Sequence, residues 1–138
     1  MNLLTGSLGT ILLILSLLHV RWAFGGVSGG VAVPSRGDGT PLFRPGPFAS
    51  LSVAGALALA AALVLARGHL IPAFLPTAWI DVGTWGVALA FAARTVGEFH
   101  YVGIFRRVRD TRFARWDARL FTPLCALLAA GTAWLAAS

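Results

Sequence analysis

The stretch that decides the fold is Leu3–Phe24, LLTGSLGTILLILSLLHVRWAF, which has no charged residue before Arg21. A helix needs about 20 consecutive, mostly apolar residues to cross the hydrocarbon core of a bilayer, and this stretch is long enough. A cleaved signal peptide is the alternative. Such peptides begin with a basic segment, whereas Met1–Ser7 has no charged side chain. We therefore expect a retained membrane-spanning helix.

Three further apolar stretches follow, and together they predict an all-α, integral membrane four-helix bundle in a single domain, residues 1–138. They are Phe48–Ala66, Trp79–Tyr101 and Leu120–Ala137. The third is the weakest prediction, because Asp81, Arg94 and Glu98 interrupt it. Without it, the chain would cross the membrane three times and carry a long interfacial stretch.

Composition supports a membrane protein. Hydrophobic residues make up 57% of the chain and charged residues only 12%, about half the charged fraction of a soluble domain. All basic residues are arginines, which excludes a Schiff base to retinal or pyridoxal phosphate, since both need a lysine. The arginines lie close to the apolar stretches, so anionic lipid headgroups are nearer partners than nucleic acid. The single cysteine, Cys125, excludes an intrachain disulfide.

The arginines also predict the orientation of the bundle. The connections after the first and third spans share one side of the membrane, whereas the opposite side has only Arg67. Cytoplasmic loops carry the excess of basic residues, so we expect these two connections in the cytoplasm and both termini outside. The basic residues of the two connections are Arg21, Arg36, Arg44, Arg106, Arg107, Arg109, Arg112, Arg115 and Arg119.

Small residues recur at about every fourth position of the last three spans. In the third span they are Gly86, Ala90, Ala93 and Gly97. Helices in lipid associate where small side chains let their backbones approach. The repeats therefore predict helix contacts and a tight bundle.

The two long connections differ in character. GGVSGGVAVPSRGDGTPLFRPGP (residues 25–47) is rich in Gly and Pro and should be irregular. GIFRRVRDTRFARWDARLF (residues 103–121) is loosely amphipathic and predicts a short interfacial helix. Its aspartates, Asp110 and Asp117, are available to cap that helix or to pair with arginines. Its arginines at lipid-headgroup level would be Arg106, Arg107, Arg109 and Arg112.

Arg94 is the strongest candidate for a functional residue, because an arginine within a span is costly unless it is compensated. Glu98, one turn later, can pair with it, but the guanidinium has more donors than one carboxylate accepts. His19 lies near the same end of the first span, next to Arg21. We predict a ligand-binding site on the cytoplasmic side, formed by His19, Arg21, Arg94 and Glu98.

Metal and haem sites are weaker alternatives. His19 and His100 could face each other as haem ligands, and Glu98 could join them at a zinc ion, which needs three or four convergent ligands. No haem motif or second ligand pair accompanies them. We therefore predict no metal and no cofactor.

Three pieces of the chain resemble a known family when taken together: HVRWAFGG (19–26), DGTPLFRPGP (38–47) and RTVGEFHYVGIFRRVRDTRFARWDARLFTPLC (94–125). The family is one of small bacterial inner-membrane proteins catalogued as domain of unknown function 3995. The resemblance covers nearly the whole chain and implies four helices in a bacterial membrane, without an established activity or cofactor. It also implies a basic residue at the position of His100 in many members, which argues against His100 as an obligatory ligand.

Three functions follow from these observations. The first is a multi-pass protein of the bacterial inner membrane, more plausibly not an enzyme, that binds a lipid, a small amphiphile or a partner helix at the polar site. The second is a membrane-embedded enzyme that acts on an anionic or lipid substrate, with His19 or Glu98 as general base. The third is a small proton-coupled transporter with Glu98 as carrier. The expected partners are membrane lipids and a second copy or another membrane protein, and not nucleic acid.

Overall fold

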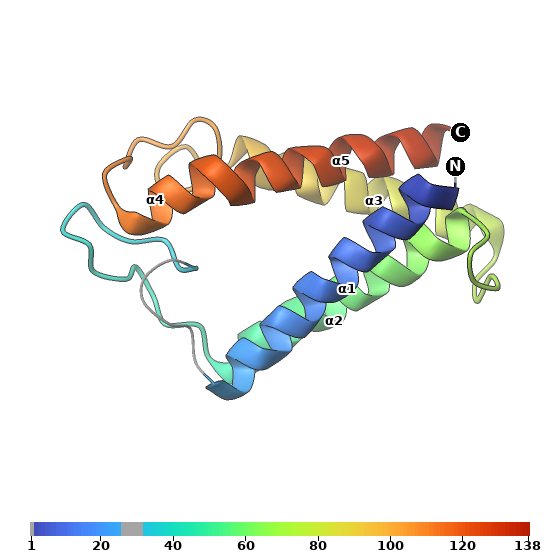
Figure 1. The fold of residues 1–138 in the computed structure, drawn as a ribbon, viewed down its shortest axis with the longest axis horizontal. Coiled ribbons are helices and arrows are strands. Elements are labelled where there is room, and N and C mark those ends of the chain that lie inside the picture. Colours follow the sequence, from blue (N-terminus) through green and yellow to red (C-terminus); the bar gives the residue numbers. More distant parts are fainter. Residues whose placement is uncertain (1, 26–31) are drawn as a thin grey trace.

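The computed structural model describes residues 2–25 and 32–138, and this part of the chain is helical, with a single isolated β-bridge between Ser35 and Pro41. The predicted all-α class is confirmed. Four helical rods cross the molecule, the last of which consists of three consecutive segments (Figure 1). The segments are α1 (Asn2–Gly25), α2 (Pro47–Arg67), α3 (Thr77–Val96), α4 (Arg112–Trp116), the π-helical η1 (Asp117–Phe121) and α5 (Thr122–Ala137).

Prolines and glycines define the ends of the middle helices. α2 begins at Pro47, because a proline is tolerated in the first turn, where its missing N–H is not needed. Pro76 is the N-cap residue of α3, and its carbonyl accepts hydrogen bonds from the amides of Trp79 and Ile80. Gly97 ends α3 with a φ of +81°, a conformation that glycine adopts without steric penalty.

The last rod starts earlier than the predicted span of residues 120–137. Thr111 caps it, since its hydroxyl accepts a hydrogen bond from the Ala114 amide at 3.1 Å, and the helix then continues from Arg112 to Ala137. The predicted interfacial helix over 103–121 is therefore wrong for residues 103–111, which are irregular. Residues 112–121 continue directly into α5, because no glycine or proline interrupts the helix between Arg112 and Thr122.

Among the described helices, three are long and apolar enough to cross a membrane: Asn2–Gly25, Pro47–Arg67 and Arg112–Ala137. The predicted third span, 79–101, is shorter in the structure and ends at Val96, since Gly97 turns the chain. α3 carries Asp81 and Arg94 and lies beside α5 along most of its length (Figure 1).

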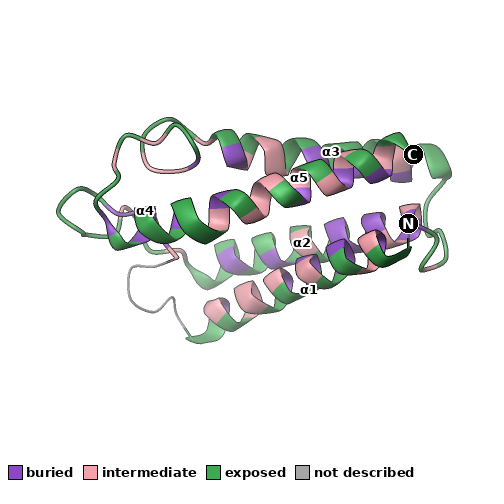
Figure 2. Cartoon of the chain, turned by 45° about the horizontal axis from the view of Figure 1, so that its top comes forward, coloured by how far each residue is buried: buried purple, intermediate pink, exposed green. Residues whose placement is uncertain are grey.

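The helices form two antiparallel pairs, α1 with α2 and α3 with α5, that splay apart like a V (Figure 1). The pairs meet near the chain termini, where Gly131 of α5 lies so close to α1 that a Cβ on it would be 2.9 Å from the Leu8 side chain. Leu12, Val64 and Leu128 are almost fully buried in the core between the pairs. Buried residues line the facing sides of the helices, and exposed residues face outward (Figure 2).

The small-residue prediction holds only in part. The predicted repeat in the second span is Ala54, Ala58, Ala62 and Ala66, of which the first and last are buried and Ala58 is exposed. The α3 positions Gly86, Ala90 and Ala93 are exposed. The predicted tight bundle is wrong at the end where the two helix pairs splay apart (Figure 1). α3 packs chiefly against α5, and its residues Gly86 and Ala90 border an open groove between α2 and α3.

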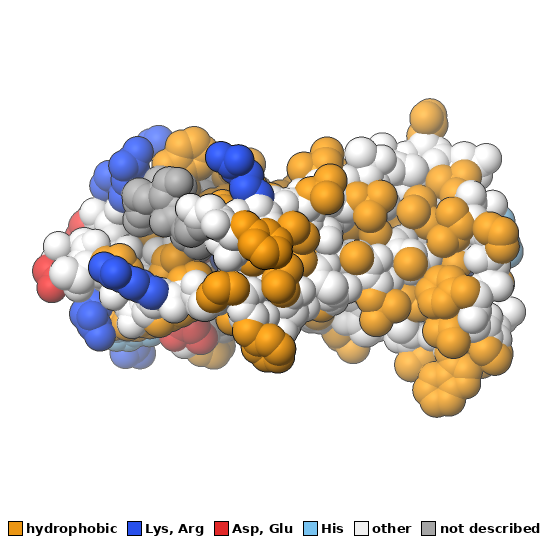
Figure 3. Space-filling model, turned by 90° about the horizontal axis from the view of Figure 1, so that it is seen from below, with side chains coloured by type: hydrophobic (Ala, Val, Ile, Leu, Met, Phe, Trp, Pro, Cys, Tyr) orange, Lys and Arg blue, Asp and Glu red, His pale blue; other side chains and the backbone are white. Residues whose placement is uncertain are grey.

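Charge is segregated along the molecule. Both termini and the α2–α3 connection lie at one end (Figure 1), and the arginines of the two long connections gather at the other (Figure 3). The irregular conformation predicted for residues 25–47 is confirmed for 32–46, whereas residues 26–31 lie outside the described part.

Candidate functional site

A buried carboxylate organises the arginine-rich end. Asp117, the first residue of η1, has no exposed side-chain surface, and its Oδ1 accepts a 2.7 Å hydrogen bond from Nη2 of Arg94. Its Oδ2 accepts from Nη1 of Arg106 at 3.2 Å, from the Gly103 amide at 3.0 Å and from the Thr122 hydroxyl at 3.0 Å. The last turn of α3, the 97–111 connection and the start of α5 are thereby joined through one side chain.

This cluster carries a surplus of positive charge, because two guanidinium groups share a single carboxylate. Arg94 Nη1 and Arg106 Nε are buried and have no hydrogen-bond partner among the described residues. The Arg94 side chain is 33% exposed and that of Arg106 only 11%. A buried donor without an acceptor is unfavourable, so the arrangement favours an additional anion near Arg94.

The 97–111 connection is shaped by two glycines packed back to back. Gly97 and Gly103 both have positive φ angles, of +81° and +88°, and a Cβ on either would overlap the other's backbone region. The Ile104 amide donates to the Thr95 carbonyl at 2.9 Å, which closes the turn. This close contact positions the Gly103 amide for its hydrogen bond to Asp117.

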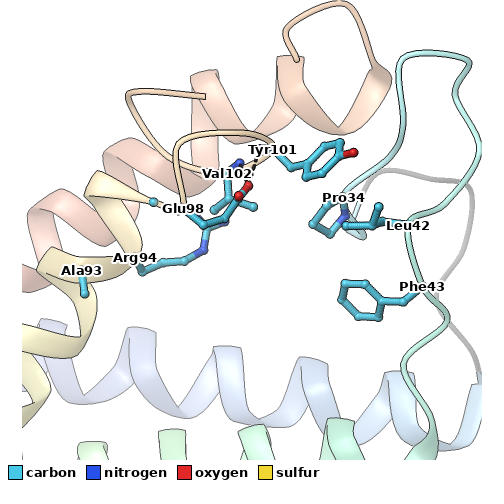
Figure 4. Close-up of a pocket in the computed structure, with 9 residues that line it drawn as sticks. Pro34, Leu42, Phe43, Ala93, Arg94, Glu98, Tyr101 and Val102 are labelled. Atoms are coloured by element: carbon cyan, nitrogen blue, oxygen red, sulfur yellow. Dashed lines mark hydrogen bonds between the residues drawn. The ribbon is translucent and has the colours of Figure 1, made fainter. Parts of the chain in front are cut away.

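Two cavities meet at Arg94. The inner cavity, of about 360 Å³, lies between the two helix pairs and has mainly apolar walls. The outer cavity, of about 680 Å³, lies between the first connection and the end of α3. Pro34, Arg94 and Val102 line both cavities. In Figure 4, Pro34 and Phe43 of the first connection face the outer cavity from the side opposite Arg94.

The predicted Arg94–Glu98 pair is replaced by Arg94–Asp117. The Glu98 carboxylate instead accepts hydrogen bonds from the backbone amides of Tyr101 and Val102, the latter at 3.1 Å (Figure 4). Both interactions of Glu98 are local, since the chain turns directly after α3 and brings these amides over the carboxylate. Glu98 still lines the outer cavity with Arg94.

The other predicted ligand-binding residues are only partly brought together. His19 lines the inner cavity with Arg94, and its Nδ1 donates to the Leu15 carbonyl at 2.8 Å. Its ring packs edge-on against Trp22, with centroids 4.8 Å apart. Arg21 is exposed and does not line either cavity. The role of these residues in binding stays a prediction.

The four predicted headgroup arginines fall into two groups by exposure. Arg107, Arg109 and Arg112 are exposed, as lipid contact requires. Arg106 is instead turned inward to Asp117, and it also donates to the Gly103 carbonyl at 2.6 Å. Sequence reasoning left Asp117 as a cap or an arginine partner without choosing which arginine, because 23 positions separate it from Arg94.

The fold and this cluster define a class: a multi-helix protein with three described helices long and apolar enough to cross a membrane, and with a charged cluster buried at one end of its helices. The chain belongs to a family described as proteins of unknown function, DUF3995, whose sequence profile matches residues 12–132. The match includes every residue of the cluster and of the inner cavity. Comparison with curated proteins and with solved structures gave no match.

Proposed function

We propose that this protein spans the bacterial inner membrane, with its arginine-rich end in the cytoplasm, and binds an anionic amphiphile between its two helix pairs. The observation that carries the proposal is the surplus guanidinium charge of Arg94 at the junction of an apolar and a more open cavity. The anionic headgroup would contact Arg94, and the acyl chain would enter the inner cavity.

The shape and lining of the inner cavity support this class of ligand. Its volume of about 360 Å³ lies at the lower end of the range for small-molecule sites, roughly 300–1,000 Å³. If a methylene group takes the ~30 Å³ of a water molecule, the cavity holds roughly a dozen such groups. It therefore has room for one acyl chain of about that length. Leu15, Leu57 and Phe91 supply apolar contacts.

The charge of the site supports an anionic rather than a neutral headgroup. The carboxylate that faces the outer cavity, Glu98, is held by two backbone amides. Arg94 Nη1 has no partner among the described residues, and a guanidinium can bind a carboxylate or phosphate through two parallel hydrogen bonds.

α3 is proposed to lie within the membrane beside α5, with Arg94 near the inner interface and Arg107, Arg109 and Arg112 at headgroup level.

The test compares two ligands that share one acyl chain. The binding of palmitate and of uncharged monopalmitin is measured by native mass spectrometry of the purified protein in nonionic detergent. We expect tighter binding of palmitate, and Arg94→Gln should weaken it by roughly 10- to 100-fold, the value of a charge-assisted hydrogen bond. Monopalmitin binding should not change.

Arg36→Gln is the matched control, since it removes the same charge from an exposed position of the first connection that lines neither cavity. Equal binding of the two ligands to the unmodified protein, or equal losses in the two variants, would refute the proposal.

A further inference from the structure

A third hollow lies on the outer side of the helices, next to the inner cavity. This side groove, of about 530 Å³, runs between α2 and α3. Its walls include Ser52 and Leu59 of α2 and Gly83, Gly86 and Ala90 of α3. Its outer face is open because Gly86, Ala90 and Leu59 are exposed. In a membrane, the groove would face lipid.

The side groove and the inner cavity share a wall. Val53, Leu57 and Phe91 line both, so these three side chains separate the interior of the V from the surrounding bilayer. All three are apolar, and Leu57 and Phe91 are only partly buried. An acyl chain passing between them would meet no charged group.

The distance along α3 from Arg94 to the Gly83 end of the groove matches the thickness of one leaflet. From Arg94 to Gly83 is eleven residues along α3, which at 1.5 Å per residue is about 16 Å. Half of the hydrocarbon core of a bilayer is about 15 Å thick. A chain with its headgroup at Arg94 would therefore extend through the groove toward the middle of the membrane.

The groove is not filled by the protein's own packing. A Cβ added at Gly86 would meet no atom within 4 Å, whereas one at Gly83 would lie 2.9 Å from the Leu63 side chain. α3 therefore approaches α2 at Gly83 and leaves space at Gly86. The exposed small residues that sequence reasoning assigned to helix contacts border this space.

We infer that the side groove is the binding site for the distal acyl chain of a membrane-derived amphiphile whose headgroup lies at Arg94. The inference rests on the proposed function and adds two points to it: the tail leaves the inner cavity between Val53, Leu57 and Phe91, and the ligand enters laterally from the bilayer. A short chain would fill the inner cavity alone, and a long chain would also use the groove.

The experiment blocks the groove without touching the headgroup site. Gly86→Phe places a large side chain in the open space, and Gly55→Phe is the matched control. Gly55 lies on α2, outside the three cavities, and a Cβ there also meets no atom within 4 Å. Native mass spectrometry then measures the binding of octanoate and palmitate to each purified variant.

We expect Gly86→Phe to weaken palmitate binding by about tenfold, comparable to the loss of roughly two buried methylene groups. Octanoate binding should stay unchanged, and Gly55→Phe should alter neither. Ala90→Leu, at an exposed position of the same groove, should reproduce the selective loss if Gly86→Phe is not recovered as folded protein.

Other outcomes separate the two proposals. Unchanged palmitate binding in Gly86→Phe and Ala90→Leu would overturn the groove and leave the headgroup site standing. Equal loss of both chain lengths would also overturn it, because the effect would not depend on the tail. A change from dimer to monomer without a change in palmitate binding would assign the groove to a second copy of the chain. Failure of the unmodified protein to bind either ligand would refute the proposed function itself.

Discussion

Arg94 and Asp117 form a 2.7 Å ion pair between the last turn of α3 and the first residue of η1. The carboxylate is fully buried, and it also receives Arg106, the Gly103 amide and the Thr122 hydroxyl. The pair therefore joins the 97–111 connection to the helices. It also leaves Nη1 of Arg94 without a hydrogen-bond acceptor among the described residues, next to the two cavities.

Removing the carboxylate should destabilise the protein strongly. Asp117→Ala leaves the partly buried Arg94 and Arg106 without their anion, and breaking a buried pair from one side costs about 3–5 kcal/mol. The free energy of unfolding in detergent, followed by circular dichroism during denaturant titration, measures the effect. Asp110→Ala is the control, because Asp110 is exposed. An equally small effect of both substitutions would contradict a central role for Asp117.

The two back-to-back glycines should be intolerant of a side chain. Gly97→Ala and Gly103→Ala each force a positive φ on alanine, at about 1–2 kcal/mol, and also a backbone overlap. We expect lower melting temperatures and faster proteolysis within residues 98–110.

Gly37→Ala serves as the control for this pair, since Gly37 lies in the other connection and a Cβ there meets no atom within 4 Å. Unchanged protease resistance in Gly97→Ala would show that the turn adapts to a side chain.

The orientation in the membrane is tested by cysteine labelling in a Cys125→Ala background. Cysteines at the exposed positions Gly37 and Asp110 should be protected from an impermeant thiol reagent in intact cells, since we expect these arginine-rich connections in the cytoplasm. A cysteine at Ala73, in the exposed α2–α3 connection, should react. The reverse pattern would invert the topology.

The turn of the first connection that contains Asp38 and Thr40 should respond to acid. Hydrogen bonds from the Thr40 hydroxyl and amide to Asp38, at 2.7 and 2.9 Å, lower the pKa of Asp38 below its ordinary value of 3.8. A lowered pKa in the folded state means that these bonds stabilise the turn above pH 3.8 and are lost as the pH falls through the folded pKa. The NMR shift of the Thr40 amide should titrate below pH 3.8, and Asp38→Asn should abolish that titration.

Helix content followed from local patterns that need no tertiary contact. Leu3–Phe24 and Phe48–Ala66 are long apolar runs, and their helices were predicted to within one residue at each end, a difference usual for helix ends. The predicted C-terminal end of α3 and the predicted start of the last rod were less accurate. The apolar pattern continues past Gly97, where α3 ends, and it begins well after Thr111, which caps the last rod. A positive φ and a cap decide these boundaries, and hydropathy does not report either.

The sequence alone also identified Arg94 as the residue to explain, since an arginine within a span needs compensation wherever it lies. Only the tertiary structure decided that its partner is Asp117. Glu98 is one turn away and Asp117 is 23 positions away, so local spacing favoured the wrong carboxylate. The splay of the two helix pairs, and with it the cavities at Arg94, was likewise undetermined by the apolar pattern, because any of several packings would bury the same residues. Close contacts such as Gly131 with Leu8 at one end, and the Asp117 cluster at the other, select the one observed.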